Sequence, residues 1–100
     1  MTQKLMNVKV HTILGLKKII GKSEIHMTIS EGRTLKELIN QMIDTYGDEL
    51  ASSLYDDSGN GFLPFIRLMI NGRDIGFLDG PDTILSDGDE ILILPPISGG

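Results

Sequence analysis

The sequence contains no cysteine, no tryptophan and no long apolar run. Without cysteine there is no disulfide, no thiolate metal site and no cysteine nucleophile. No apolar stretch approaches the roughly 20 residues that cross a bilayer. The first residues, MTQKLMNVKVHT, have neither an apolar signal core nor a small-residue cleavage site. We therefore expect a cytoplasmic protein with no membrane partner.

Aromatic residues are also few, with three Phe and two Tyr in 100 residues. A chain of this length suits one domain with a modest core. It has little material for a deep ligand pocket, and no serine or aspartate stands in a pattern that marks a nucleophile and its base. We expect a single domain over residues 1–100 that binds no cofactor and is not itself an enzyme.

Positive charge is scarce in the second part of the chain. Residues 1–36 hold seven Lys/Arg against two Glu, whereas residues 37–100 hold two Arg against twelve Asp/Glu. An acidic surface repels nucleic acid and favours a basic protein partner, mainly through the rate of encounter. The alternative is a solvated acidic surface that only aids solubility.

Apolar and polar residues alternate in two segments near the N-terminus, residues 5–14 and 24–29. This period of two predicts two half-buried strands that pair antiparallel. The segment between them, GLKKIIG, has a glycine at each end and is interpreted as a long hairpin loop or a single helical turn.

A helical period begins at Thr34. It predicts a helix of about three turns with a single apolar stripe, in which Thr34 and Glu37 form a capping box and Gly47 is the left-handed residue at the end. The stretch DELASSLY after Gly47 suggests one further turn. The stripe consists of Leu35, Leu38, Ile39, Met42, Ile43 and Tyr46.

Two further strands are predicted after the helix, at residues 65–70 and 90–94. Asn71-Gly72 is a strong hairpin signal, so the first of them is followed by a short return strand, RDIGF. The order strand, strand, helix, strand, short strand, strand predicts an α+β domain, a mixed sheet with one main helix packed on one face.

Three features resemble ligand sites without meeting their requirements. GLKKIIGKS, residues 15–23, has five residues between its glycines where a phosphate-binding loop has four. The run that starts at Asp56 resembles a calcium loop, but its twelfth position is Arg67 instead of glutamate. His11 and His26 stand on separate strands with no carboxylate or second ligand at metal spacing. No metal site is expected.

The chain ends in LPPISGG. Pro95 and Pro96 cannot donate to a sheet ladder and favour an extended conformation, so they are expected to end the last strand and start a flexible tail, residues 95–100. Gly99 and Gly100 leave the terminal carboxylate sterically bare, which suits its delivery into the active site of another protein. For acyl chemistry the carboxylate must first be activated, most simply as a mixed anhydride with AMP, so a partner would use ATP.

The last strand, EILIL, is apolar on both of its faces. If Ile91 and Ile93 face the helix, the side chains between them face outward, where an apolar patch usually marks a protein interface. The alternative is that a loop or the long hairpin covers this face. The residues predicted to meet a partner are Leu92, Leu94, Met69 and Phe65.

The run NGRDIGFLDGPDTILSDGDEILILPPISGG, together with GLKKIIG and EGRTLKELI, resembles the ubiquitin-like sulfur-carrier family (MoaD/ThiS-like). The similarity is greatest to the small subunit of molybdopterin synthase and extends over nearly the whole chain. The resemblance implies a β-grasp fold whose last residue, Gly100, is adenylated and then converted to a thiocarboxylate, with Gly99 beside it. By position it also implies an inserted tail that includes Pro95, Pro96, Ile97 and Ser98.

The implied partners are a ubiquitin-activating-like adenylyltransferase, a sulfur donor such as a rhodanese or cysteine desulfurase, and an acceptor. In the most similar relatives the acceptor is the large subunit of molybdopterin synthase. The chain departs from the compact family pattern in DELASSLYDDSGNGFLPF, residues 48–65, and at Ser98, where alanine is common. These departures leave thiamine, cysteine or tRNA thiolation open as the acceptor pathway. A modifier that forms isopeptide bonds, and an interaction module with an inert tail, also stay open.

Overall fold

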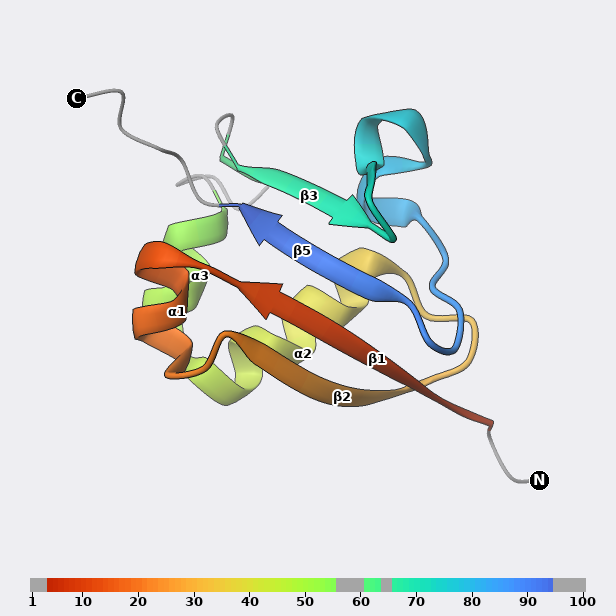
Figure 1. Ribbon diagram of the computed structural model, residues 1–100, viewed down its shortest axis with the longest axis horizontal. Helices are drawn as coiled ribbons and strands as arrows, with labels where there is room; N and C mark the ends of the chain where they lie inside the picture. The colour runs from red at the N-terminus through yellow and green to blue at the C-terminus, as the bar shows by residue number, and fades with distance from the viewer. Residues whose placement is uncertain (1–3, 56–60, 64–65, 95–100) are drawn as a thin grey trace.

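The computed structural model describes residues 4–55, 61–63 and 66–94, and its centre is a mixed five-stranded sheet. Across the sheet the strands follow the order β2-β1-β5-β3-β4 (Figure 1). β1 and β5 run parallel, and every other neighbouring pair runs antiparallel. The predicted α+β class and mixed sheet are therefore confirmed. The strands are β1 (Leu5–Thr12), β2 (Glu24–Ser30), β3 (Arg67–Ile70), β4 (Arg73–Asp74) and β5 (Glu90–Leu94).

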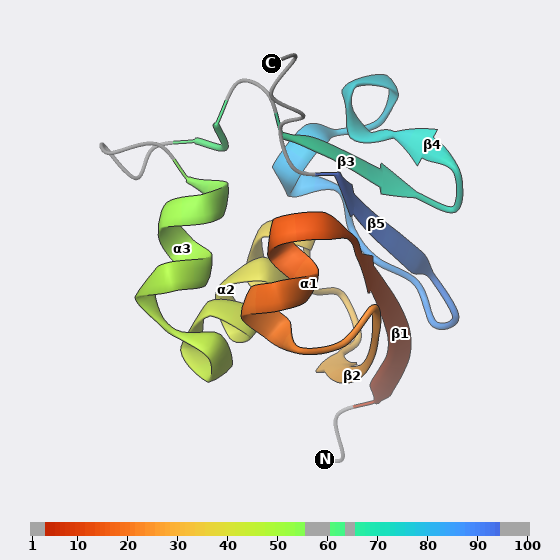
Figure 2. The same cartoon turned by 60° about the vertical axis from the view of Figure 1, so that its left-hand side comes forward.

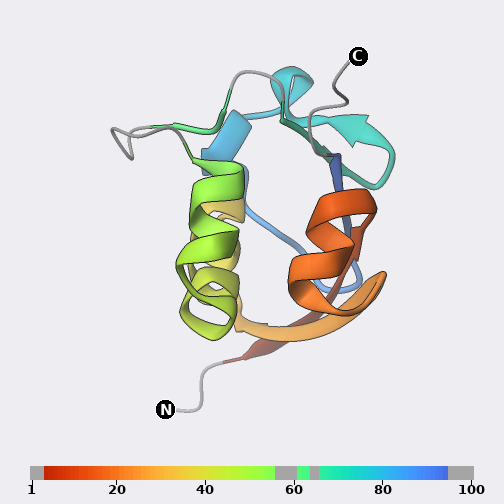
Figure 3. The ribbon, with the colours of Figure 1, turned by 90° about the vertical axis from the view of Figure 1, so that its left-hand side faces the viewer.

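The helices are α1 (Leu14–Ile20), α2 (Leu35–Tyr46) and α3 (Asp48–Leu54), and two 3-10 turns follow, η1 (Ile75–Phe77) and η2 (Gly80–Asp82). All three α-helices lie on the same side of the sheet (Figure 2). Viewed from the left-hand side of Figure 1, α1 and α3 stand next to each other (Figure 3). No described helix is long and apolar enough to span a membrane.

The hydrophobic core fills the space between the sheet and the helices. The strands turn one apolar face inward, and α2 contributes the stripe that the sequence predicted. Four residues of that stripe are buried completely, whereas Ile43 and Tyr46 are partly buried at its edge. The buried residues of the sheet are Met6, Val8, Val10, Thr12, Ile29, Leu68, Ile70, Ile91 and Ile93, and those of the helices are Leu16, Ile20, Leu35, Leu38, Ile39, Met42, Leu50 and Leu54.

The N-terminus of α2 has the capping box expected from Thr34 and Glu37. The Glu37 backbone N–H donates to Thr34 Oγ1 (3.3 Å), and the Thr34 backbone N–H donates to Glu37 Oε1 (3.0 Å). These two bonds satisfy donors that a helix start otherwise leaves without partners. They fix where the helix that covers the core begins.

Four local expectations are corrected by the structure. The return strand expected over residues 73–77 is only β4, because Ile75–Phe77 form the 3-10 turn η1. Leu14, expected at the end of the first strand, lies in α1, because β1 ends at Thr12. Gly47 has a positive φ of 84° but an extended ψ of −165°. The chain therefore bends sharply at Gly47 between α2 and α3, and this residue does not form the left-handed helical cap that the sequence predicted. The connection between β1 and β2 forms the two-turn helix α1, whose Leu16 and Ile20 enter the core, so it does not cover the open face of the sheet.

The hairpin signal Asn71-Gly72 is confirmed. Both residues have positive φ, 53° and 81°, as a two-residue type I′ turn requires. The Asn71 side chain also holds the start of β5, because its Nδ2 donates to Asp89 Oδ1 (2.8 Å) and its Oδ1 accepts from the Glu90 N–H (2.9 Å). The turn therefore ties β3 and β4 to the last strand.

Thr34→Ala is expected to lower the free energy of unfolding by about 1 kcal/mol, because the capping side chain is lost. Thr45→Ala is the matched control: Thr45 lies in the last turn of α2 and bonds only the Gln41 carbonyl (3.3 Å), where alanine favours the helix. Urea denaturation of both variants measures the difference. Equal losses would contradict the capping role.

Stability should also fall on acidification through Glu37. Its hydrogen bonds to the Thr34 backbone and to Arg33 hold its pKa below the ordinary value of 4.5. A carboxylate with a lowered pKa stabilises the fold above its ordinary pKa and loses that contribution as pH falls through the folded value. Glu37→Gln should therefore show a shallower fall of unfolding free energy below about pH 4.5 than the wild type. Asp44→Asn, on the same helix, should follow the wild-type curve.

Candidate functional site: the open face of the sheet

One row of side chains crosses all five strands on the face that the helices leave open. The register places His11 opposite Glu24 on one side and Leu92 on the other, and Leu92 opposite Met69, which in turn faces Asp74. Because alternate residues of a strand point to opposite faces, all five lie on the face away from the buried Ile91 and Ile93. The row is charged at both ends and apolar in the centre.

Leu92 and Met69 form the apolar centre of this row. Both are half-buried, while their chain neighbours Ile91, Ile93, Leu68 and Ile70 are buried. Leu94 follows on the same face, opposite Arg67. We call Leu92, Met69 and Leu94 the sheet patch. The sequence placed these three residues on the outward face, and the structure puts them there together.

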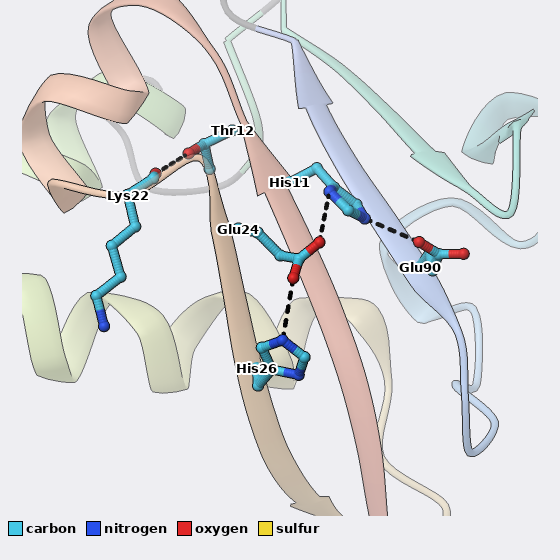
Figure 4. Close-up of polar contacts among 6 residues, drawn as sticks. All are labelled: His11, Thr12, Lys22, Glu24, His26 and Glu90. Atoms are coloured by element: carbon cyan, nitrogen blue, oxygen red, sulfur yellow. Dashed lines mark hydrogen bonds and ion pairs between the residues drawn. The ribbon is translucent and has the colours of Figure 1, made fainter.

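A cluster of ionisable side chains from β1, β2 and β5 borders the sheet patch (Figure 4). His11 Nε2 lies 2.9 Å from Glu90 Oε1, and His11 Nδ1 lies 3.7 Å from Glu24 Oε1. The second oxygen of Glu24 is 3.0 Å from His26 Nε2. No sequence pattern predicts this cluster, because the two histidines have no carboxylate or second ligand at metal spacing along the chain. Its members come together only through the pairing of β1 with β2 and with β5.

The far end of the row is held by a second ion pair. The Arg67 guanidinium lies 3.3 Å from Asp74 Oδ2, and Asp74 Oδ1 accepts the Gly76 N–H (2.8 Å). These contacts, the backbone bond foremost, hold the pKa of Asp74 below its ordinary value. Asp74 is therefore a carboxylate at neutral pH, and it fixes the turn after β4.

The open face carries a depression as well as the sheet patch. A polar depression of about 340 Å³ opens beside the patch, lined by Asn7, Lys9, His26, Asp87 and Glu90 among others. Within residues 4–55, 61–63 and 66–94, no group of three His, Asp or Glu side chains is arranged to hold a metal ion. An apolar centre with a charged rim is the usual anatomy of a protein–protein contact.

The sheet also determines where the predicted tail begins. β5 is the central strand, with hydrogen-bonded neighbours on both sides, and its last residue is Leu94. The buried side chains of Ile91 and Ile93 pack β5 into the core. The tail therefore starts from one of the best-held strands of the sheet. The predicted site residues Phe65, Pro95, Pro96, Ile97, Ser98, Gly99 and Gly100 lie outside the described residues.

This fold and open face define a class, the ubiquitin-like β-grasp proteins. A solved structure of small archaeal modifier protein 1 from Methanosarcina acetivorans superposes with a TM-score of 0.78 at 30% identity, covering 97% of this chain and 99% of that one. The ThiS family model matches residues 15–100. The chain belongs to the ThiS family of ubiquitin-like sulfur carriers.

Curated relatives are carriers and modifiers. Small archaeal modifier protein 3 of Haloferax volcanii is 27% identical, over 95% of this chain and all of that protein. Sulfur carrier protein CysO of Mycobacterium tuberculosis is 33% identical, over 71% of this chain and 76% of that protein. Ubiquitin-related modifier 1 of Saccharomyces cerevisiae is 31% identical, over 96% of this chain and all of that protein. The chain thus belongs with small carrier and modifier proteins and not with enzymes.

Such proteins work through partners. A solved structure of Amycolatopsis orientalis CysO is a complex with BexX; its fold matches this chain with a TM-score of 0.75 at 26% identity, covering 93% of this chain and 99% of that one.

The two faces of β5 should respond differently to mutation. Leu92→Ser, on the open face, should change the free energy of unfolding by less than about 1 kcal/mol, whereas Ile93→Ala should cost about 2–5 kcal/mol because it leaves a cavity in the core. Urea denaturation measures both. Similar losses would place Leu92 in the core and remove the sheet patch from the exposed surface.

Proposed function

We propose that this protein is a sulfur carrier that works through the carboxylate of Gly100. A carboxylate oxygen of Gly100 attacks the α-phosphorus of ATP in a partner enzyme, so that pyrophosphate leaves and an acyl adenylate forms. The outer sulfur of a persulfide on a donor protein then displaces AMP and forms an acyl disulfide with the carrier. A thiol reductant cleaves the S–S bond of this intermediate, which releases the thiocarboxylate. The carrier chain supplies the acyl group, and the partner supplies the ATP site.

The observation that carries this proposal is the match of the ThiS family over residues 15–100, which includes the segment PPISGG. The fold supports it in two ways. β5 ends at Leu94, directly before Pro95, so the segment continues from a firmly held central strand. The sheet patch lies on that same strand, so a partner bound to the patch is close to the start of the tail.

The chemistry of the open face also supports a protein partner. Leu92 and Met69 offer apolar area, and the carboxylates of Glu24, Glu90 and Asp74 surround it. A partner with an apolar centre and basic side chains at its rim would complement this surface. The acidic balance of residues 37–100 favours the same partner through the rate of encounter.

The acceptor that the sequence favours is the large subunit of molybdopterin synthase, in the assembly of the molybdenum or tungsten cofactor. A second candidate, modification of lysines through an isopeptide bond, is favoured by the similarity to small archaeal modifier protein 3 and to ubiquitin-related modifier 1. Both begin with the same adenylate, so they differ in the nucleophile that attacks the activated carbonyl. Acceptor assays with the large synthase subunit, and branched peptides at lysine, distinguish them.

Incubation with ATP, the activating enzyme and a sulfur donor should raise the intact mass of the protein by the difference between sulfur and oxygen. Deletion of Gly99 and Gly100 should abolish this product while the unfolding transition stays unchanged, because the core ends with β5. Intact-protein mass spectrometry measures the product and also establishes whether the mature chain ends at Gly100. A wild-type protein that forms no adenylate and no thiocarboxylate would contradict the proposal.

A further inference from the structure

Phe77 is the most exposed large apolar side chain among the described residues, at 84%. The other described aromatic side chains, Tyr46, Tyr55 and Phe62, are partly buried against the core. Tyr55 and Phe62 also stack on each other, with ring centroids 5.1 Å apart. Phe77 is thus the one described aromatic ring that the fold presents to solvent. Aromatic side chains dominate the energetics of protein interfaces when a partner buries them.

The turn that carries Phe77 is held firmly in place. Asp74 Oδ1 accepts the Gly76 N–H (2.8 Å) at its start, and the Leu78 N–H donates to the Ile75 carbonyl (2.9 Å) at its end. The side chains of Ile75 and Leu78 pack against the core on either side of Phe77. The ring is therefore presented from an ordered backbone, so a partner that binds it loses little further conformational entropy.

Two exposed carboxylates follow this turn along the chain. Residues 73–90 contain six carboxylates against a single arginine, Arg73. Asp79 and Asp82 are exposed, and no described residue pairs with either carboxylate. Unpaired charges next to an exposed ring are complementary to an apolar pocket whose rim carries lysine or arginine.

The turn that carries Phe77 and the start of the tail lie at opposite ends of the sheet. In Figure 1 the η1 and η2 turns lie at one end of the sheet, and β5 finishes at the other end, next to the start of β3. A partner that holds Phe77 therefore leaves the point where the tail begins free. The sheet patch, which lies on β5 and β3, runs between the two ends.

We propose that Phe77 is an aromatic anchor that inserts into an apolar pocket, rimmed by basic side chains, on the enzyme that adenylates Gly100. This inference rests on the proposed function, because adenylation is the step that a sulfur carrier and a modifier share. The enzyme must select the carrier by its folded body before any chemistry at the tail. Phe77 with Asp79 and Asp82 supplies such a contact at a distance from the reacting carboxylate.

The test measures the steady-state rate at which the activating enzyme adenylates the full-length carrier. ATP–pyrophosphate exchange is the assay. Phe77→Ala should raise the KM for the carrier roughly 10- to 100-fold, the range expected when one buried aromatic contact is lost. The kcat at saturating carrier should stay within about twofold of wild type, because the contact is the same in the ground state and the transition state. Urea denaturation should show unchanged stability, since the ring is exposed.

Ile84→Ala is the matched control, because it removes another exposed apolar side chain, at 64%, from the same connection between β4 and β5. Its KM should equal that of wild type. The double variant D79N/D82N should reduce the dependence of KM on salt, since it removes two charges from the rim of the contact.

Three outcomes would overturn the inference. The first is an unchanged KM for Phe77→Ala with active wild-type carrier. The second is an equal rise for Ile84→Ala, which would indicate diffuse apolar contact. The third is a wild-type dimer in light scattering that Phe77→Ala dissociates, which would make a second copy of this chain the occupant. A wild-type carrier that is never adenylated would instead overturn the proposed function.

Discussion

The parallel pairing of β1 with β5 is the contact on which the rest of this structure depends. It joins residues about 80 positions apart in the sequence and places the last strand in the middle of the sheet. Val10, Ile91 and Ile93 are fully buried along this pairing. Closing so long a loop costs chain entropy, which the burial of β-branched side chains on the core side offsets. Without this pairing, neither the open face nor the start of the tail has a defined position.

The two faces of the sheet have different roles. The face toward the helices is apolar from β2 to β3 and holds the fold together. The open face keeps an apolar centre only at the sheet patch, and it surrounds that centre with Glu24, Glu90 and Asp74. β5 contributes to both faces through alternate residues, so one strand of five residues anchors the core and offers contact area to a partner.

The surface features suit a protein that other proteins handle. Among the described residues no group of three His, Asp or Glu side chains is arranged to hold a metal ion, and apolar side chains reach the surface at several places, of which the sheet patch and Phe77 are two. These two places are separated along the sheet, so they can serve two contacts at once. A carrier that passes between an activating enzyme and an acceptor needs such a surface, because its own body performs none of the chemistry.

Local sequence signals predicted much of the fold. Alternation located β1 and β2; the apolar run EILIL located β5; the capping pair Thr34 and Glu37 located the start of α2; Asn71-Gly72 located the hairpin. Each of these signals depends on residues within a few positions of one another, which restrict the local backbone conformation strongly. The helix α1 was underestimated because its short pattern, LGLKKII, has too few turns for a helical period to show.

The sequence alone determined the backbone preferences of residues 95–100, since proline restricts φ and glycine leaves the backbone free wherever they stand. It also determined that β5 would be apolar on both faces. Only the tertiary structure decided which charged side chains share the open face with the sheet patch. His11, Glu24 and Glu90 form a cluster because strand order and register are set by long-range burial that no local pattern encodes.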